Sequence, residues 1–342
     1  MNRQGVSALV SCCSLLLISS VCVAQGKVTY KLTQIGTNNA TTSTFVTGMN
    51  DEGTLGLTVS TESNTNVYLW RHGTTTNIGG LTASATFVEG GALNDLGQVV
   101  GTTSSAKTGQ SVGFLWQFGH ATQLPSPANS TAAFASTINL LGQVAGQAYD
   151  ESSISHAVTW NRGQVTILPG IPNSQFTEPV GINLTGEIAG ISYDENERPT
   201  AVIWRKGVLT VALSDAMPNG LNDLGQIVGF SNGAPFIWEA STVTVLPLIG
   251  TGAEGSAEAI NDWGQIVGTE TTSTGTTEAL IWQRSGAAVV NLNTLVAKSD
   301  PLRPYVTLSE GTLINNLGEI VATGNDSRIP DFQQYYLLTP SF

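Results

Sequence analysis

The chain has 342 residues, only 11% of which are charged, and its acidic residues outnumber the basic ones to give a formal net charge of −12. Such a chain, which also lacks a basic stripe, is a poor partner for nucleic acid or anionic lipid, because both are negatively charged. The abundant Thr, Ser, Gly and Asn favour strands and turns over helices.

The first segment, 1–24, predicts a secretory signal peptide. It begins Met-Asn-Arg, continues as a nearly uncharged apolar stretch over 6–23 and ends at Ala24. A short positive start, an apolar core and a small residue at the exit are typical of a signal peptide. We therefore expect cleavage after Ala24 and a secreted or periplasmic mature chain over 25–342. Lipidation at the run 9–12 is an alternative, although this run precedes most of the apolar core.

All three cysteines lie inside this leader, at positions 12, 13 and 22. The mature chain is therefore expected to have no disulfide, no thiolate metal site and no cysteine nucleophile. No later stretch approaches the ~20 apolar residues that span a bilayer. We expect a monomer without an integral membrane segment.

Seven copies of one motif follow along the chain, each with an apolar residue, Asn, two variable residues and Gly. The motif Asn residues are Asn50, Asn94, Asn139, Asn183, Asn222, Asn261 and Asn315. They are separated by 44, 45, 44, 39, 39 and 54 residues, a regularity that indicates a repeat architecture. The Asn side chain can bond nearby amides and Gly accepts a positive φ, so each motif predicts a tight turn.

A short apolar strand ending in Trp follows each of the first six motifs, and Leu338 replaces Trp in the seventh. The six residues are Trp70, Trp116, Trp160, Trp204, Trp238 and Trp282. Because they recur at the repeat period, we assign them to the core. With the turn and the apolar run that come next, each unit predicts four short strands.

Four strands in a unit of about 44 residues predict a seven-bladed β-propeller that forms one domain over 25–342. The last unit, 306–338, lacks a fourth strand, whereas the N-terminal strand over 28–35 has no unit of its own. Pairing the two would close the ring and protect its edges. The alternative is an open β-solenoid of seven repeats, which would need polar capping units that the sequence does not show.

The motif Ile-Asn-Asp-x-Gly-Gln-Ile-Val-Gly, best matched over 260–268, and the strand ending in Trp resemble the bacterial extracellular HAF-repeat proteins. The resemblance covers essentially the whole mature chain. The family's His-Ala-Phe is approximated by His156-Ala157-Val158, which is typical of a divergent member. The resemblance implies an exported bacterial repeat protein with no established enzymatic activity, and it supplies no catalytic residues.

Positions where the units differ are the candidates for function. Trp263 occupies a turn position held elsewhere by Leu, Thr or Glu, where its ring could stack on a sugar or cover the end of the core. The longest insertion, 296–311, carries Asp300, Arg303 and Tyr305, a charge pair with an aromatic side chain. Loops often carry function, so these residues are candidates for ligand binding, although a linker into the last unit is the preferred interpretation of the insertion.

Two neighbouring units carry matching acidic loops between their second and third strands. The residues are Asp150 and Glu151 in one loop and Asp194 and Glu195 in the other. Because hard cations prefer several carboxylate and carbonyl ligands, the two loops predict a shared Ca²⁺ site. The alternative is a pair of solvated acidic hairpin tips, and no other cofactor is expected.

The sequence contains few signs of catalytic, metal-binding or nucleotide-binding motifs. His72, His120 and His156 lie in different units without metal-site spacing, and the sequence has no nucleophile elbow, phosphate loop or dinucleotide fingerprint. We therefore expect a non-enzymatic binding or surface-interaction protein with a carbohydrate or protein ligand. The alternative is a secreted propeller hydrolase or lyase acting on glycans. It needs carboxylates or a His converging on the centre, and the sequence alone reveals no such set.

Overall fold

The structure is a computed structural model that describes residues 28–79, 88–105, 108–283 and 288–341. The signal peptide expected over 1–24 therefore lies outside the described residues. The described part contains 28 β-strands, one short 3₁₀ helix, η1 (Leu292–Leu295), and no α-helix. None of its helices has the length and apolar character needed to cross a membrane. The prediction of an all-β chain is confirmed.

The strands follow the sequence repeat. Units one to three contain β2 (Thr42–Met49), β3 (Leu55–Thr61), β4 (Thr65–Arg71) and β5 (Thr74–Asn77); β6 (Val88–Leu93), β7 (Val99–Ser104), β8 (Ser111–Gln117) and β9 (His120–Gln123); and β10 (Ser130–Ile138), β11 (Val144–Asp150), β12 (Ser155–Asn161) and β13 (Gln164–Ile167). Units four to six contain β14 (Phe176–Ile182), β15 (Ile188–Tyr193), β16 (Pro199–Arg205) and β17 (Val208–Ser214); β18 (Ala216–Leu221), β19 (Ile227–Ser231), β20 (Ala234–Glu239) and β21 (Thr242–Val245); and β22 (Glu254–Ile260), β23 (Ile266–Thr271), β24 (Thr277–Gln283) and β25 (Ala288–Asn291). The last unit contains β26 (Val306–Ile314), β27 (Ile320–Asp326) and β28 (Gln333–Ser341), and β1 (Thr29–Ile35) joins it.

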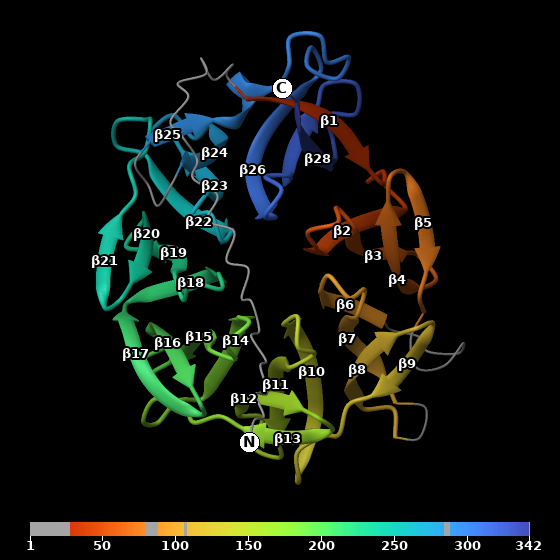
Figure 1. Cartoon of the computed structure of the whole chain (residues 1–342), viewed down its shortest axis with the longest axis vertical. Coiled ribbons are helices and arrows are strands. Elements are labelled where there is room, and N and C mark those ends of the chain that lie inside the picture. Colours follow the sequence, from red (N-terminus) through yellow and green to blue (C-terminus); the bar gives the residue numbers. More distant parts are fainter. Residues whose placement is uncertain (1–27, 80–87, 106–107, 284–287, 342) are drawn as a thin grey trace, which may run out of the picture.

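The units form separate antiparallel sheets arranged around a common centre (Figure 1). Five sheets have four strands each, and units three and four share one larger sheet through a parallel bridge between Ser155 and Phe176. The first strand of each unit lies innermost in Figure 1. These first strands contact one another in sequence order, and β26 also contacts β2. The architecture is therefore propeller-like.

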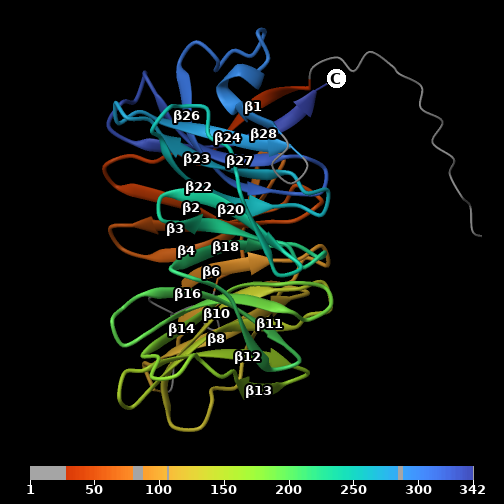
Figure 2. The same cartoon turned by 90° about the vertical axis from the view of Figure 1, so that its left-hand side faces the viewer.

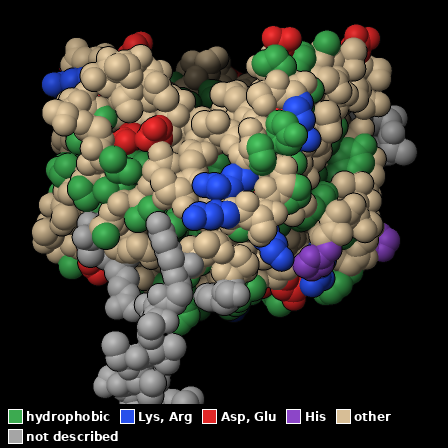
Figure 3. Space-filling model, turned by 90° about the horizontal axis from the view of Figure 1, so that it is seen from above, with side chains coloured by type: hydrophobic (Ala, Val, Ile, Leu, Met, Phe, Trp, Pro, Cys, Tyr) green, Lys and Arg blue, Asp and Glu red, His purple; other side chains and the backbone are tan. Residues whose placement is uncertain are grey.

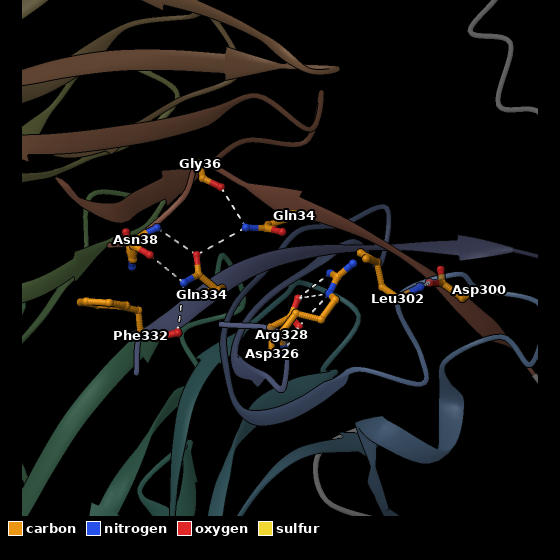
Figure 4. A network of polar contacts seen from close by, with 9 residues as sticks. All are labelled: Gln34, Gly36, Asn38, Asp300, Leu302, Asp326, Arg328, Phe332 and Gln334. Carbon is orange, nitrogen blue, oxygen red and sulfur yellow. Dashed lines mark hydrogen bonds and ion pairs between the residues drawn. The ribbon is translucent and has the colours of Figure 1, made fainter. Parts of the chain in front are cut away.

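The N-terminal strand belongs to the last unit. β1 pairs antiparallel with β28, from Thr29 opposite Ser341 to Ile35 opposite Tyr335, and the two strands lie together in the side view (Figure 2). Just after β1, a reciprocal amide contact adds to this pairing. The backbone amide of Asn38 donates to Gln334 Oε1 at 2.9 Å, and Gln334 Nε2 donates back to the Asn38 carbonyl at 3.0 Å (Figure 4).

The insertion before β26 holds the other side of β1. The Ala297 amide donates to the Tyr30 carbonyl at 2.8 Å. The Leu32 amide donates to Asp300 Oδ2 at 2.8 Å, and Asp300 Oδ1 accepts from the Leu302 amide at 2.8 Å. Both oxygens of this buried carboxylate therefore bond to backbone, and they fix the insertion against the N-terminal strand.

The core lies largely between neighbouring units. For example, Val228 and Ile237 of unit five pack against Leu280 and Trp282 of unit six. Five of the six strand Trp side chains are buried, as the repeat period predicts. Trp116 is the exception, because it is only half-buried and lines a surface cavity beside Phe118.

A repeated glycine allows the first strand of a unit to bulge. In unit six, Gly268 on β23 pairs with Ala257 on β22, and the register shifts between Ala257 and Ala259, so that Glu258 is the extra residue. A Cβ on Gly268 would lie 2.1 Å from the Ser256 carbonyl oxygen. The same kind of register shift recurs in the first strands of other units. Bulges of this kind re-aim side chains, and here they lie on the innermost strands.

We expect Gly268→Ala to lower the free energy of unfolding by about 1–3 kcal/mol, the usual cost of overpacking. The new methyl group would force β22 and β23 apart at the bulge. Urea unfolding followed by Trp fluorescence measures the loss. Ser273→Ala on the exposed hairpin between β23 and β24 is the control, expected within ±0.5 kcal/mol of the parent. An equal effect of both substitutions would contradict the close approach at Gly268.

Candidate active site

The motif Asn residues bond the units together. Each Asn Oδ1 accepts from the backbone amides two and four residues later, as Asn261 does from Trp263 at 3.1 Å and from Gln265 at 3.0 Å. Each Asn Nδ2 donates to the carbonyl of the motif Asn in the following unit, at 2.9 to 3.4 Å. Asn315 of the last unit donates to the Asn50 carbonyl of the first at 3.1 Å. The hydrogen bonds therefore form a cycle through all seven units.

Acidic side chains surround the centre on the motif face. Asp51, Asp223, Asp262 and Asn316 line a small hollow of about 170 Å³. Asn316 Nδ2 bridges Asp51 Oδ2 at 2.9 Å and Asp262 Oδ2 at 2.8 Å. Burial raises the pKa of Asp223, and the neighbouring aspartates raise it further, while the Leu184 amide opposes the shift. These carboxylates bond mainly to backbone and side-chain amides of adjacent units.

Two glutamates lie together on the innermost strands of units six and seven. Glu258 is on β22 and Glu310 on β26, both are half-buried, and the two strands are neighbours. Burial raises the pKa of Glu310, and the charge of Glu258 raises it further. Burial also raises the pKa of Glu258, but a hydrogen bond from Ser256 partly lowers it. The two carboxylates are thus inequivalent, because among the described residues no hydrogen bond lowers the pKa of Glu310.

A short polar chain supports Glu258. Asn219 Nδ2, on the first strand of unit five, donates to Ser256 Oγ at 3.0 Å and to the Ala257 carbonyl at 3.1 Å. The Ser256 hydroxyl bonds in turn to the Glu258 carboxylate. Hydrogen bonding to the charged form favours ionisation. The Ser256 hydroxyl, itself held by Asn219, therefore favours the carboxylate form of Glu258 and partly lowers its pKa.

A third half-buried glutamate, Glu178 on β14 of unit four, has no part in this pair. Burial raises its pKa, and Gln147 Nε2 contacts its Oε1 at 3.5 Å. Burial is the cause of this shift, whereas the shift of Glu310 has the charge of Glu258 as a second cause. Glu178 is therefore a matched reference for the pair, since it lies on the same kind of strand.

Sequence reasoning missed both glutamates, because Glu258 sits in an expected strand and Glu310 was passed over at the end of the insertion 296–311. A weak signal existed, since each is an acidic residue within a short run of small and apolar residues, Ser-Ala-Glu-Ala-Ile and Leu-Ser-Glu-Gly-Thr. The repeat marks them only in part. Units two and four also carry Glu at the Glu310 position, five residues before the motif Asn, whereas no other unit carries Glu at the Glu258 position. Their convergence follows from the order of units around the centre and from the bulges.

Trp263 lies at the motif turn of unit six, with its side chain mostly exposed to solvent (71%). Its indole Nε1 donates to the Asn316 carbonyl of unit seven at 2.9 Å. This bond fixes the orientation of the ring on the motif face, where stacking on a sugar remains a prediction.

The two acidic loops are hairpin turns organised by their aspartates. Asp150 Oδ1 accepts from the Ser152 and Ile154 amides, and its Oδ2 contacts His156 Nε2 at 3.0 Å. Asp194 has equivalent backbone bonds, and its Oδ2 accepts from Arg198 Nε at 2.8 Å. The hydrogen bond with His156 and those with the loop amides lower the pKa of Asp150.

Within the described residues, no group of three His, Cys, Asp or Glu side chains is arranged to hold a metal ion. The loop residues predicted to bind calcium include Glu151 and Glu195, and both are exposed. The structure therefore does not assemble the two loops into one cation site.

The three ligand candidates of the insertion are separated by the fold. Asp300 is buried against the backbone, as described above. Arg303 is exposed and lines a surface cleft. Tyr305 lies under Arg328, whose guanidinium is 4.7 Å from the ring centroid and pairs with buried Asp326 (Figure 4). The structure thus leaves Arg303 as the member of the set that faces a cavity.

No protein-family model matches the chain, and no curated protein does. Solved propeller structures are similar to it. The β-propeller domain of the Trilobed protease from Pyrococcus furiosus gives a TM-score of 0.58 at 9% identity, with 87% of this chain and 95% of that domain covered. A puromycin hydrolase gives 0.57 at 12% identity, with 83% and 50% covered. The acylaminoacyl peptidase of Pyrococcus horikoshii gives 0.55 at 10% identity, with 88% and 52% covered.

The comparison corrects the expectation of a non-enzymatic binding or surface-interaction protein. The similar structures belong to hydrolases and peptidases, so that expectation is not carried further. This chain spans about half the length of the puromycin hydrolase and of the acylaminoacyl peptidase. At identities of 9–12% the likeness shows a propeller-like fold alone.

Proposed function

We propose that this protein is an exported β-propeller hydrolase that cleaves glycans, with Glu258 and Glu310 as its acid–base pair. The observation that carries the proposal is the pair itself. Two half-buried carboxylates, both with raised pKa values but with different polar neighbours, lie on adjacent innermost strands. Perturbed carboxylates that converge in this way are typical of catalytic sites.

The proposal assigns different roles to the two carboxylates. Glu310 has its ionisation opposed by both burial and the charge of Glu258, so it serves as the general acid that protonates the leaving-group oxygen. Glu258, which receives the Ser256 hydrogen bond, is the ionised partner that activates water or attacks the sugar. Pairs whose environments separate their pKa values are the usual basis for such a division of roles.

We further propose that the units close into a seven-bladed ring occupying 25–342. The cyclic Asn hydrogen bonds and the contact between β26 and β2 support closure. The pairing of β1 with β28 supplies the last unit with its fourth strand. A closed ring would fix the spacing of Glu258 and Glu310, which precise acid–base catalysis requires.

The remaining parts of the proposal rest on the sequence. The motif over 260–268 supports membership of the HAF-repeat family as a divergent member, and the segment 1–24 supports export. The net charge of −12 favours a carbohydrate substrate over nucleic acid. We propose that the mature chain acts as a monomer.

The test is a hydrolysis assay on a panel of purified polysaccharides, including cell-wall glycans, with release of reducing ends as the readout. We expect the parent chain to cleave at least one polymer. Glu258→Gln is expected to abolish this cleavage, whereas Glu178→Gln retains it. If Glu178→Gln and Glu258→Gln were equally active, or if no glycan were cleaved, the proposed function would be wrong.

A further inference from the structure

Units six and seven share a second feature, a cleft of about 540 Å³ outside the carboxylate pair. Its lining includes Glu278, Asn291, Asn293, Lys298, Arg303 and Val306. They come from β24, β25, η1, the insertion and the start of β26. This volume lies within the range of ordinary small-molecule sites, about 300–1,000 Å³.

The cleft concentrates positive charge on an acidic protein. Lys298 and Arg303 are exposed, and within the described residues neither forms an ion pair. The whole chain has only 13 Lys and Arg against 25 Asp and Glu. Two cations in one cleft, without an ion pair among the described residues, therefore make this cleft locally positive on an otherwise acidic chain. Figure 3, which views the side of β1, β25 and β28, shows Lys and Arg side chains near the middle of that face. Such a pair of cations suits a carboxylate or another anion.

Hydrogen bonds make the floor of the cleft rigid. Asn293 Nδ2 donates to the Leu308 carbonyl at 2.8 Å, and the Leu308 amide donates back to Asn293 Oδ1 at 2.8 Å. Asn291 Oδ1 caps η1 by accepting from the Asn293 amide at 2.9 Å. These bonds join η1 to β26, so the polar groups facing the cleft are positioned before a ligand arrives.

A carboxylate acceptor lies in the same cleft as the cations. Glu278 Oε2 accepts from Asn291 Nδ2 at 2.8 Å, and its remaining oxygen can accept from a ligand. A phosphate or sulfate offers oxygens on every side and would meet repulsion from Glu278. A sugar acid instead offers one carboxylate for Lys298 and Arg303 and several hydroxyl donors for Glu278.

From this combination we infer that the cleft is a binding site for a uronate residue of an acidic polysaccharide. Lys298 and Arg303 hold the sugar carboxylate, and Glu278 accepts from a ring hydroxyl. The site shares β26 with Glu310, so a polymer bound here lies on the same two units as the carboxylate pair. The inference does not depend on the proposed catalysis, because binding is measured without turnover.

The test measures the binding of galacturonic-acid oligosaccharides to the full chain by calorimetry. The measurement is repeated on the Glu310→Gln variant, so that cleavage cannot remove the ligand. The double variant Lys298→Gln/Arg303→Gln is expected to weaken binding at least tenfold. The matched control, Arg162→Gln/Lys206→Gln, removes two exposed charges from units three and four and is expected to bind like the parent. Raising the salt concentration weakens binding to the parent, since the charges are exposed.

Glu278→Gln and a dextran sulfate arm distinguish a sugar-acid site from a general anion site. We expect Glu278→Gln to weaken uronate binding and to strengthen binding of dextran sulfate. No measurable uronate binding, equal binding by the two double variants, or tighter binding of dextran sulfate than of uronate by the parent would each overturn the inference. A peptide ending in a free carboxylate that bound as tightly as the uronate would overturn it as well.

Discussion

Replacing Glu310 with Gln is expected to lower kcat on the susceptible glycan by about 10²–10⁴-fold, the usual contribution of a general acid. Gln preserves the shape of the side chain but cannot donate the proton that the leaving group needs. KM should change little, because the acid acts in the transition state rather than in ground-state binding. Initial rates over a range of substrate concentrations measure both constants.

The pH dependence of activity distinguishes a lost general acid from misfolding, because misfolding lowers activity without changing the shape of the pH profile. Activity should be bell-shaped, with the lower limb set by ionisation of Glu258 and the upper limb by loss of the Glu310 proton. Both pKa values are raised from the ordinary value of 4.5. Glu310→Gln should remove the upper limb from any residual activity, and a variant with an unchanged profile would contradict the assignment.

The same substitution is expected to stabilise the fold at neutral pH. The pKa of Glu310 is higher in the folded state than in the unfolded state, because the folded state disfavours the charged carboxylate. The free energy of unfolding therefore falls as the pH rises from the unfolded-state pKa through the folded-state pKa. Gln removes that cost, so Glu310→Gln should melt above the parent at pH 7 and close to it at pH 3. Loss of activity with a higher melting temperature would exclude unfolding as the cause.

The second large effect concerns the Asn cycle. Asn315→Ala is expected to lower the free energy of unfolding by about 2–5 kcal/mol, because several buried groups lose their partners and each costs about 1–3 kcal/mol. Asn315 Nδ2 bonds the Asn50 carbonyl at 3.1 Å, and its Oδ1 accepts two backbone amides. Chemical denaturation followed by circular dichroism measures the loss.

A comparison with Asn139→Ala makes this a test of ring closure. Asn139 has the same bonding pattern in the middle of the chain, with Nδ2 donating to the Asn183 carbonyl at 2.9 Å. A closed ring predicts similar losses at the two sites, whereas in an open array the bond at the end would matter much less. Asn196→Ala, on an exposed turn, is the control and should stay within ±0.5 kcal/mol.

Much of the architecture could be read from the sequence because it depends on local and periodic signals. The Asn–Gly turns and the Trp strands recur at the repeat period, so the strands and most of the core could be placed without coordinates. Trp116 shows the limit of this reasoning, since its neighbours leave it half-exposed. Periodicity assigns a position to the core on average and does not describe the packing at one unit.

The candidate site was largely beyond reach because it depends on contacts between distant segments. Asp300 looked like an exposed loop charge, but it is buried by β1, 268 residues away. Glu258 and Glu310 became a pair only once the inner strands of two units were placed side by side. Glu258 is the extra residue of a β-bulge, which depends on the strand register between β22 and β23, and the sequence pattern alone did not reveal this register.

The most direct test of the central claim is to cleave the susceptible glycan in ¹⁸O-labelled water and weigh the products. Hydrolysis by the Glu258–Glu310 pair predicts one ¹⁸O atom at each new reducing end with the parent chain and no product with Glu258→Gln. Unsaturated products free of ¹⁸O would show elimination instead of hydrolysis. Equal incorporation by the parent and by Glu258→Gln would place the catalytic groups elsewhere, and either result would contradict the account.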